Sequence, residues 1–440
     1  MNRSIYLFLV ICLSIASGAA LADKPSKKQL QGAYDDDESG LNADAMAELR
    51  DAGIDKYLGT AVSTKSEHGV WTKHAFDPLY TPDDTYPSGF RPDGPVCIAG
   101  TDYSVFTRQG DPKKLLIFLQ GGGACWQGFY NCNVFAEDQE PPEDGFFPGV
   151  FNPDSPDNPF ADYSVVYMPY CDGSTFGGDN DVNDINVPFL TRHHRGLRNV
   201  SAGIDVAAEM FPRAKQITVM GHSAGGVGVA AFAPFLTRFT FGNNTKLTVY
   251  NDAGPIAVNL GTPPGAGGPD IPWLSVWARQ NDWQFQQFYP QSCIDDGLCN
   301  AFGQQTGIIH WRLENDSTIR EGFYETDSDR TNLFFAQGDG SLMDPQDYRD
   351  LILTEHGALN EAYPRRYKRF IVSGDDTHGA VQVTAPTPNF PFLQPFSFYE
   401  REANGTPLTE WAAELVRIGQ RQSKFGWKDI VEDYVPVPIP

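Results

Sequence analysis

The stretch that decides the fold reads Ile217-Thr-Val-Met-Gly-His-Ser-Ala-Gly-Gly226. A run of β-type apolar residues enters a G-x-S-x-G pentapeptide centred on Ser223, and a helical stretch rich in Ala, Gly and Val leaves it. The pentapeptide alone is a weak signal, but a strand, a sharp turn and a helix around it are what a nucleophile elbow requires. We therefore predict that Ser223 is a nucleophile. The alternative is a glycine-rich βα turn with an inert serine.

A second glycine-rich turn, Gly121 to Gly123, follows the strand-like run 115–119. Glycine lets backbone N–H groups approach a substrate closely. In α/β-hydrolases one oxyanion donor comes from this loop and another from the residue after the nucleophile. We expect these donors at Gly122 or Gly123 and at Ala224. A phosphate loop is disfavoured because no Gly-Lys-Ser/Thr follows, and a dinucleotide fingerprint because the glycines are contiguous.

Short apolar runs alternate with helical patterns along the rest of the chain. Such alternation predicts βαβ units and a mainly parallel sheet, and continuous apolar runs suit strands that are covered on both faces. We predict an α/β fold of the α/β-hydrolase type, with helices on both faces of the sheet and long loops. Strands are expected at 115–119, 164–168, 217–220, 247–250, 322–325 and 369–372, and helices near 198–210, 226–233, 275–288, 345–355 and 409–420.

A serine nucleophile needs a histidine base, which in α/β-hydrolases follows the acid in the chain. Three histidines lie C-terminal to Ser223, namely His310, His356 and His378. Only His378 occupies a loop directly after a strand-like run, where a catalytic base belongs. His356 at the end of a predicted helix and His310 beside a tryptophan are expected to be packing or surface residues.

The acid is expected where the strand-like run 322–325 ends in carboxylates. Asp327 is the preferred candidate, with Asp329 as the alternative. A catalytic acid holds the histidine tautomer and stabilises the imidazolium ion. The competing interpretation of both residues is a solvated acidic loop.

The N-terminus has the pattern of an export signal. Arg3 precedes a mostly apolar run over 5–19, and Ala20-Leu-Ala22 offers a cleavage site after Ala22. The run is shorter than the roughly 20 apolar residues needed to span a bilayer. We predict a signal peptide at 1–22, a polar, acidic and loop-rich lead-in at 23–95, a single catalytic domain at 96–440, and a secreted or periplasmic protein.

Six cysteines follow the predicted signal: Cys97, Cys125, Cys132, Cys171, Cys293 and Cys299. An even number in an exported chain suggests disulfides, and six cysteines allow 15 connectivities, among which sequence alone does not choose. Close spacing favours Cys125–Cys132 and Cys293–Cys299, which would leave Cys97–Cys171. A metal site is disfavoured because neither a CxxC pair nor clustered histidines accompany the cysteines.

Acidic residues outnumber basic residues by 56 to 33, for a formal net charge of −23. Such a balance argues against nucleic acid and anionic membranes as partners. We also expect no membrane span, while the oligomeric state is not predicted.

The sequence resembles the pectinacetylesterase family, which includes the Notum-like deacylases. The resemblance extends from about Cys97 to His378, which is most of the predicted mature chain, and rests on these motifs: Leu119-Gln-Gly-Gly-Gly-Ala-Cys125, Tyr170-Cys-Asp-Gly-Ser-Thr-Phe-Gly-Gly-Asp179, Arg195-Gly-Leu-Arg198, Gly221-His-Ser-Ala-Gly-Gly226, Asp252-Ala-Gly254 and His378. It implies an α/β-hydrolase fold, hydrolysis of carboxylic esters without a cofactor, and a triad of Ser223, Asp327 and His378. The family's cysteine pattern supports Cys97–Cys171 and Cys125–Cys132.

The chain departs from the family in places that affect the substrate. Plant members usually have glutamate and tryptophan where this chain has Gln120 and Ala124, which alters the expected pocket floor. Polygalacturonate is a polyanion, and a protein of strongly negative charge does not steer toward it without a local basic patch, for which 192–198 holds three arginines. The long tail after His378 has no clear counterpart in the family.

We therefore predict a secreted serine esterase that acts on an acylated carbohydrate or another acyl ester. Trp126, Phe129 and Tyr130 are candidates for an acyl pocket, and their alternative role is packing within the Cys125–Cys132 loop. A lipid or small-acyl esterase is one alternative function, and a non-catalytic exported binding protein on the same scaffold is another.

Overall fold

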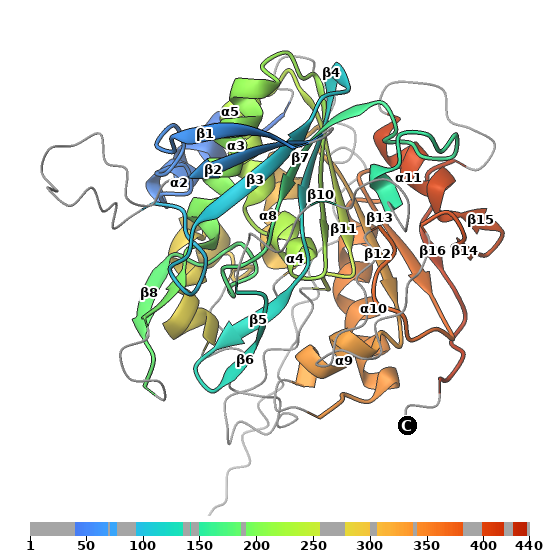
Figure 1. The fold of residues 1–440 in the computed structure, drawn as a ribbon. Helices are drawn as coiled ribbons and strands as arrows, with labels where there is room; N and C mark the ends of the chain where they lie inside the picture. The colour runs from blue at the N-terminus through green and yellow to red at the C-terminus, as the bar shows by residue number, and fades with distance from the viewer. Residues whose placement is uncertain are drawn as a thin grey trace, which may run out of the picture. The chain divides into compact units, whose positions relative to one another are not determined.

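A computed structural model of the chain contains one large sheet, shown in Figure 1. Its ten strands lie in the order β1 (Ser63–His68), β2 (Trp71–Phe76), β3 (Tyr103–Arg108), β7 (Tyr163–Met168), β4 (Asp111–Leu119), β10 (Gln216–His222), β11 (Lys246–Asp252), β12 (Arg320–Thr326), β13 (Tyr367–Val372) and β16 (Ile430–Val431). The structure describes residues 40–68, 71–76, 94–134, 141, 149–185, 191–255, 278–299, 306–337, 341–381, 398–417 and 426–437. The predicted signal peptide lies outside these residues.

The strands from β7 to β16 run parallel, whereas β1, β2 and β3 form an antiparallel extension at one edge. All six predicted strands are present, as β4, β7, β10, β11, β12 and β13. The prediction of an α/β fold with a mainly parallel sheet is confirmed.

The order of the strands reverses at β4. The chain moves from β4 outward to β7 and then returns to the other side of β4 as β10, which is parallel to β4 with Leu119 opposite Gly221. In open α/β sheets, ligands bind outside the carboxyl ends of the strands at such a reversal. The glycine turn after β4 and Ser223 after β10 therefore emerge side by side at the expected place for a site.

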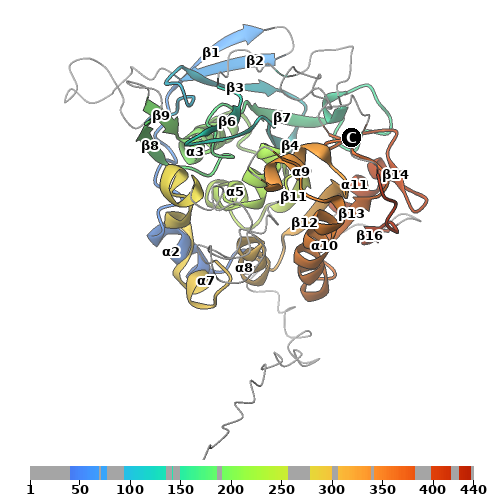
Figure 2. The same ribbon diagram turned by 90° about the horizontal axis from the view of Figure 1, so that it is seen from below.

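Both faces of the sheet are covered. Side chains alternate between the faces along each strand, so one strand contributes to the core on each side. On β4, Leu115, Ile117 and Leu119 join one core cluster, while Leu116 and Phe118 join the other. The first cluster is completed by α2 (Ala43–Asp51), α3 (Gly196–Met210), α5 (Ala233–Phe241), α8 (Gly307–Asn315) and α10 (Pro345–Ala362), and the second by α11 (Leu408–Val416) (Figure 2).

Local sequence determines where several elements begin. Asp344 caps α10 by accepting from the N–H groups of Gln346 and Asp347, and Pro345 occupies the first helical position.

The other elements are α4 (Ala224–Ala230), α7 (Gln291–Asp295), α9 (Arg330–Gln337), η1 (Gly149–Phe151), η2 (Ala278–Trp283), η3 (Phe285–Phe288) and the hairpins β5–β6 (Gly123–Trp126, Phe129–Cys132), β8–β9 (Asn180–Asn183, Thr191–His194) and β14–β15 (Glu402–Ala403, Thr406–Pro407).

Two predicted segments differ in the structure. The single helix expected at 275–288 is, over its described part, a π-helix (η2) and a 3-10 helix (η3) separated by Gln284 in the left-handed conformation. The lead-in, predicted to be polar, acidic and loop-rich, contributes Leu41, Ala45 and Leu49 to the core. These apolar residues recur at helical spacing between acidic ones, and burial of that one stripe holds α2 against the domain.

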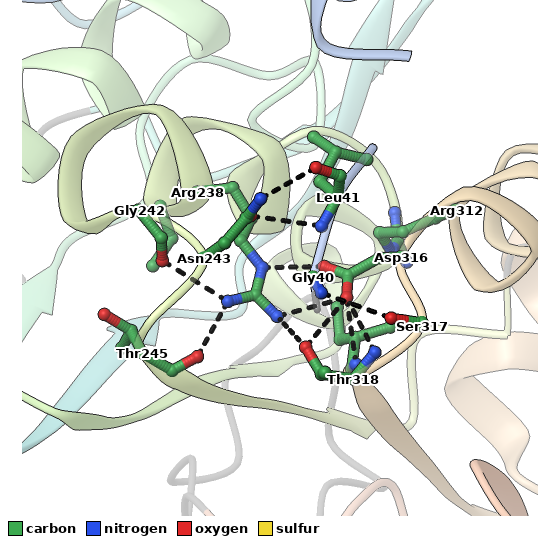
Figure 3. Close-up of polar contacts among 12 residues, drawn as sticks. Gly40, Leu41, Arg238, Gly242, Asn243, Thr245, Arg312, Asp316, Ser317 and Thr318 are labelled. Carbon is green, nitrogen blue, oxygen red and sulfur yellow. Dashed lines mark hydrogen bonds and ion pairs between the residues drawn. The ribbon is translucent and has the colours of Figure 1, made fainter. Parts of the chain in front are cut away.

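A buried polar network fastens this N-terminal segment (Figure 3). The backbone of Leu41 exchanges two hydrogen bonds with the side chain of Asn243, at 3.1 and 2.8 Å. Next to it, Arg238 Nε donates to Asp316 Oδ2 at 2.6 Å, and Arg238 also donates to the carbonyl oxygen of Thr245 at 2.7 Å. Both members of the ion pair are 1% exposed, which makes it a buried pair with its hydrogen bonds satisfied.

Three disulfides are present, Cys97–Cys171, Cys125–Cys132 and Cys293–Cys299. The predicted pairing is confirmed. Within the described residues, no single helix has both the length and the apolar composition to cross a membrane, and one bent pair, α4 with α5, meets these two criteria jointly.

Candidate active site

Ser223 stands on a sharp turn between β10 and α4. Its backbone has φ 54° and ψ −119°, a conformation that costs energy for a residue with a side chain. A Cβ on Gly221 would lie 2.1 Å from the oxygen of Gly225, and one on Gly225 would lie 2.0 Å from the oxygen of Leu119. The glycines of the G-x-S-x-G motif are therefore required by close backbone contacts, as a nucleophile elbow demands.

The glycine turn after β4 is crowded in the same way. A Cβ on Gly122 would lie 2.3 Å from Tyr170, and one on Gly123, whose φ is +80°, would lie 2.0 Å from the oxygen of Asn131. Asn133 donates from its backbone to the oxygen of Gly122 at 2.8 Å, which ties the turn to the residue after the β5–β6 hairpin. This rigid backbone brings Gly123 to the wall of the same cavity as Ser223 and Ala224.

His378 lies on the loop after β13, close to the elbow. Its ring centroid is 4.9 Å from that of His222, the residue before Ser223. The other two candidate bases have different surroundings. His356 is fully buried between the hydroxyl of Tyr367 and the carbonyl of Pro255, and His310 packs its ring against Tyr363.

Asp329, and not Asp327, contacts the imidazole of His378. Asp329 Oδ2 lies 2.7 Å from His378 Nδ1, and its other oxygen, Oδ1, accepts from the backbone N–H of Asn332 at 2.9 Å. Asp327, the preferred candidate from the sequence, instead forms an ion pair with Arg349 from α10. The geometry thus favours the alternative acid, which sits at the start of α9 and uses one oxygen for the helix and one for the histidine.

The electrostatics suit a neutral base. Burial lowers the pKa of His378 to about 4, and the nearby Asp252 carboxylate opposes this shift. The residue is 8% exposed, and its Nε2 has no hydrogen-bond partner among the described residues. With Nδ1 directed to Asp329, Nε2 is the nitrogen left to accept a proton.

Asp252, at the end of β11, anchors the histidine loop. Its carboxylate accepts from the backbone N–H groups of Ala380 at 3.0 Å and Val381 at 3.3 Å, and from His222 Nδ1 at 2.6 Å, while its carbonyl accepts from Ser223 N at 2.8 Å. One residue thereby links the elbow to the loop of His378. The sequence prediction assigned Asp252 no role, although an aspartate at the carboxyl end of the strand beside the elbow was a usable signal.

A cavity of about 870 Å³, a volume that includes space open to solvent, begins at Ser223. Its wall is mostly apolar and aromatic: Gly123, Ala124, Trp126, Thr175, Ser223, Ala224, Val227, Ala253, Pro255, Trp283, Phe285, Tyr289, Ile308, Asn332, Phe335 and Ala336. Of the three aromatic residues predicted for an acyl pocket, Trp126 lines the cavity. Phe129 stacks behind Trp126 with ring centroids 4.1 Å apart, and Tyr130 is 45% exposed with its hydroxyl on Asp184.

The loop of the YCDG motif supports the wall at Thr175. Asp172 is fully buried and accepts from Ser174 N at 2.7 Å and from Phe176 N at 3.3 Å. Thr175 and Phe176 have φ values of 53° and 62°, which is a strained left-handed backbone. Burial raises the pKa of Asp172 to about 6, against the opposing effect of the hydrogen bonds from Ser174.

The aromatic wall at 283–289 is held by a buried arginine. Arg192 pairs with Asp282 at 2.6 Å and with Asp184 at 3.0 Å, and Trp283 donates from its indole to the oxygen of Cys125 at 2.8 Å. The neighbouring arginines at 195 and 198 are paired with Asp181 and Asp179. These three side chains are therefore neutralised and do not form the basic patch that a polyanionic substrate would need.

Metal ligands are a further possible component of a hydrolase site. In the part of the chain that the structure describes, no group of three or more His, Cys, Asp or Glu side chains is arranged to hold a metal ion. We therefore assign no metal-binding role to any of these side chains.

The segment that carries the elbow also matches a known family. Residues 89–259 match the family model of pectinacetylesterase. The resemblance inferred from the sequence is thereby confirmed for this segment, which carries the glycine turn, the YCDG loop and Ser223. The match supports an ester-hydrolase function, while Asp329 and His378 lie beyond the matched residues.

Among solved structures, the chain is similar to that of the Wnt deacylase Notum from Drosophila. It is 18% identical in sequence, and the alignment covers 76% of this chain and 94% of that chain with a TM-score of 0.49.

Proposed function

We propose that the protein is a serine carboxylic-ester hydrolase with Ser223 as nucleophile, His378 as base and Asp329 as the orienting acid. The observation that carries this proposal is the convergence at one place of a strained serine turn, a glycine turn and a buried His–Asp pair, all from different strands of the sheet. Such a constellation is recognised by geometry and roles rather than by sequence position.

Each group has a defined step in the reaction. Ser223 Oγ attacks the ester carbonyl carbon while its proton passes to Nε2 of His378. The backbone N–H groups of Ala224 and of Gly122 or Gly123 stabilise the oxyanion. His378 then returns the proton to the leaving alcohol as the acyl–oxygen bond breaks. Water, activated by the same base, hydrolyses the acyl-serine and releases the carboxylic acid.

The wall of the cavity supports an apolar acyl group longer than acetyl. Binding sites for small organic groups are lined mainly by apolar and aromatic side chains, and this cavity presents five aromatic rings beside Ser223. Ala124 lines the cavity at a position where plant members of the family usually have tryptophan, so a large side chain is missing here. The neutralised arginines argue further against a polyanionic substrate. Three disulfides support action outside the reducing cytoplasm.

A graded series of p-nitrophenyl esters tests the proposal. We expect kcat/KM to rise from acetate to esters of medium length, by up to about fourfold for each CH₂ buried, since one buried CH₂ contributes roughly 0.8 kcal/mol. Ser223→Ala should abolish hydrolysis of every ester. Ala124→Trp should retain acetate hydrolysis and lose the preference for longer chains.

Two outcomes would contradict the proposal. Hydrolysis by Ser223→Ala at the wild-type rate would remove the serine mechanism. A wild-type rate that falls steadily from acetate onward, with no effect of Ala124→Trp, would remove the cavity as the acyl site.

A further inference from the structure

A second carboxyl group lies directly behind the proposed catalytic acid. Glu325, near the end of β12, is completely buried, as is Asp329. Its oxygens accept hydrogen bonds from neutral groups: Thr326 N at 3.0 Å, Asn332 Nδ2 at 2.9 Å and the hydroxyl of Tyr348 at 2.9 Å. None of these partners is a cation that would compensate an ionised glutamate.

The two carboxyl groups form one hydrogen-bonded unit. Asn332 Nδ2 donates to Glu325 Oε2 at 2.9 Å and to Asp329 Oδ2 at 3.1 Å, so one amide group joins an oxygen of each carboxyl group. Two carboxylates in contact inside a protein do not both ionise, because the second negative charge is desolvated and repelled. One proton is therefore retained between them.

The surroundings place this proton on Glu325. Asp329 accepts from His378 Nδ1 and from the backbone N–H of Asn332 at the start of α9, and both contacts favour a carboxylate. Burial and the adjacent charge of Asp329 raise the pKa of Glu325 well above its ordinary value. The other titratable groups around the pair are Asp252 from β11, Tyr324 from β12 and Tyr348 from α10.

We propose that Glu325 is a positioning residue that, as a neutral carboxylic acid, donates a hydrogen bond to Asp329 and holds that carboxylate against Nδ1 of His378. This inference rests on the proposed function of Ser223, Asp329 and His378. The site then carries a chain of four groups from the nucleophile to Glu325, with a single net negative charge at its buried end. Glu325 moderates the charge of Asp329 and thereby the basicity of His378.

Three substitutions separate positioning from a merely structural role. Glu325→Gln keeps a neutral donor of the same length, Glu325→Met keeps the shape without a donor, and Glu325→Asp keeps a carboxyl group but withdraws it from Asp329 by one methylene. We expect Gln to retain kcat within about threefold, and Met and Asp to lower kcat by about 10-fold or more with little change in KM.

The acidic limb of the pH profile is the decisive readout. Without the hydrogen bond from residue 325, Asp329 bears more charge and stabilises the imidazolium of His378. The pH midpoint of the kcat/KM profile should therefore rise by about half a pH unit or more in Glu325→Met and Glu325→Asp. It should stay in place in Glu325→Gln. A structural role would lower the fraction of active sites, counted by fluorophosphonate titration, without moving the midpoint. If Met fails to fold, the Asp variant carries the test.

The outcomes distinguish the two proposals. Wild-type activity that does not depend on Ser223 would refute the proposed function itself. Two results would overturn the role of Glu325 alone, provided that activity depends on Ser223. One is a Glu325→Asp variant with the kcat and the pH midpoint of the wild type. The other is an equal loss of kcat in Glu325→Gln and Glu325→Asp.

Discussion

Replacing Asp329 or Asp327 singly by asparagine tests which of the two is the catalytic acid. In Asp329→Asn the amide oxygen is expected to stay where Oδ1 now accepts from Asn332 N, at 2.9 Å. The NH₂ group then faces His378 Nδ1, which in the native protein lies 2.7 Å from Oδ2. Nδ1 must then accept a hydrogen bond from this NH₂ group, so the imidazole proton moves to Nε2. With Nε2 protonated, the ring no longer accepts the proton of Ser223.

The expected loss is large because this contact is buried and serves one tautomer. Replacing the aspartate of a serine triad by asparagine lowers kcat by about 10⁴-fold, which corresponds to roughly 5.5 kcal/mol of transition-state stabilisation. We expect Asp329→Asn to lower kcat by about 10³–10⁴-fold. Asp327→Asn is the matched control, since it weakens the ion pair with Arg349 and should change kcat less than about 10-fold.

The assay is hydrolysis of p-nitrophenyl butyrate, normalised to active sites by fluorophosphonate titration and accompanied by thermal unfolding of each variant. A kcat for Asp329→Asn within about 10-fold of the wild type would refute the assignment, as would a loss in Asp327→Asn equal to or larger than that in Asp329→Asn.

The same structure supports three further predictions. Because the neutral form of His378 is the base and its pKa is lowered to about 4, kcat/KM should stay constant as pH falls from 7 toward 5 and decline only near pH 4, and a decline centred near 6.5 would contradict this. Arg238→Met should destabilise the fold by about 3–5 kcal/mol in urea unfolding because it leaves Asp316 buried without its cation, while the control Arg50→Met, at a side chain 58% exposed, should change stability little. Gly225→Ala should yield little folded protein because its methyl would lie 2.0 Å from the oxygen of Leu119, whereas Gly357→Ala, within α10, would meet only the flexible end of the Arg369 side chain and should express and keep activity.

The parallel part of the sheet could be predicted because most of its long strands contain a short run of apolar residues. Leu115 to Leu119 is buried on both faces, and a short apolar run of this kind is typical of an inner strand in an α/β chain. The antiparallel edge was missed. Its outer strands, Ser63–His68 and Trp71–Phe76, carry several polar and charged residues, so they show no comparable apolar run.

The acid of the site illustrates a different limit. Asp327 and Asp329 both follow β12 within three residues, and the strand pattern does not say which side chain turns toward the histidine. The decision depends on α10, which brings Arg349 to Asp327, and on α9, which begins directly after Asp329. An aspartate three residues before Asn332, at the head of a helical pattern, is a helix-cap signal that favours Asp329.

The wall of the cavity could not be predicted from local patterns. The segment around Trp283 has a helical pattern but is held as a π-helix and a 3-10 helix by contacts with distant residues. These are the ion pair of Asp282 with Arg192 and the hydrogen bond of Trp283 to Cys125. Tertiary contacts override local propensity at such places.

Covalent labelling of the nucleophile tests the central claim most directly. A fluorophosphonate probe is incubated with the folded protein, and the modified residue is located by peptide mass spectrometry. We predict one adduct per chain, on the hydroxyl of Ser223, which forms in the wild type, is absent in Ser223→Ala and forms much more slowly in His378→Ala. No adduct, or an adduct on another residue that persists in Ser223→Ala, would contradict the serine mechanism.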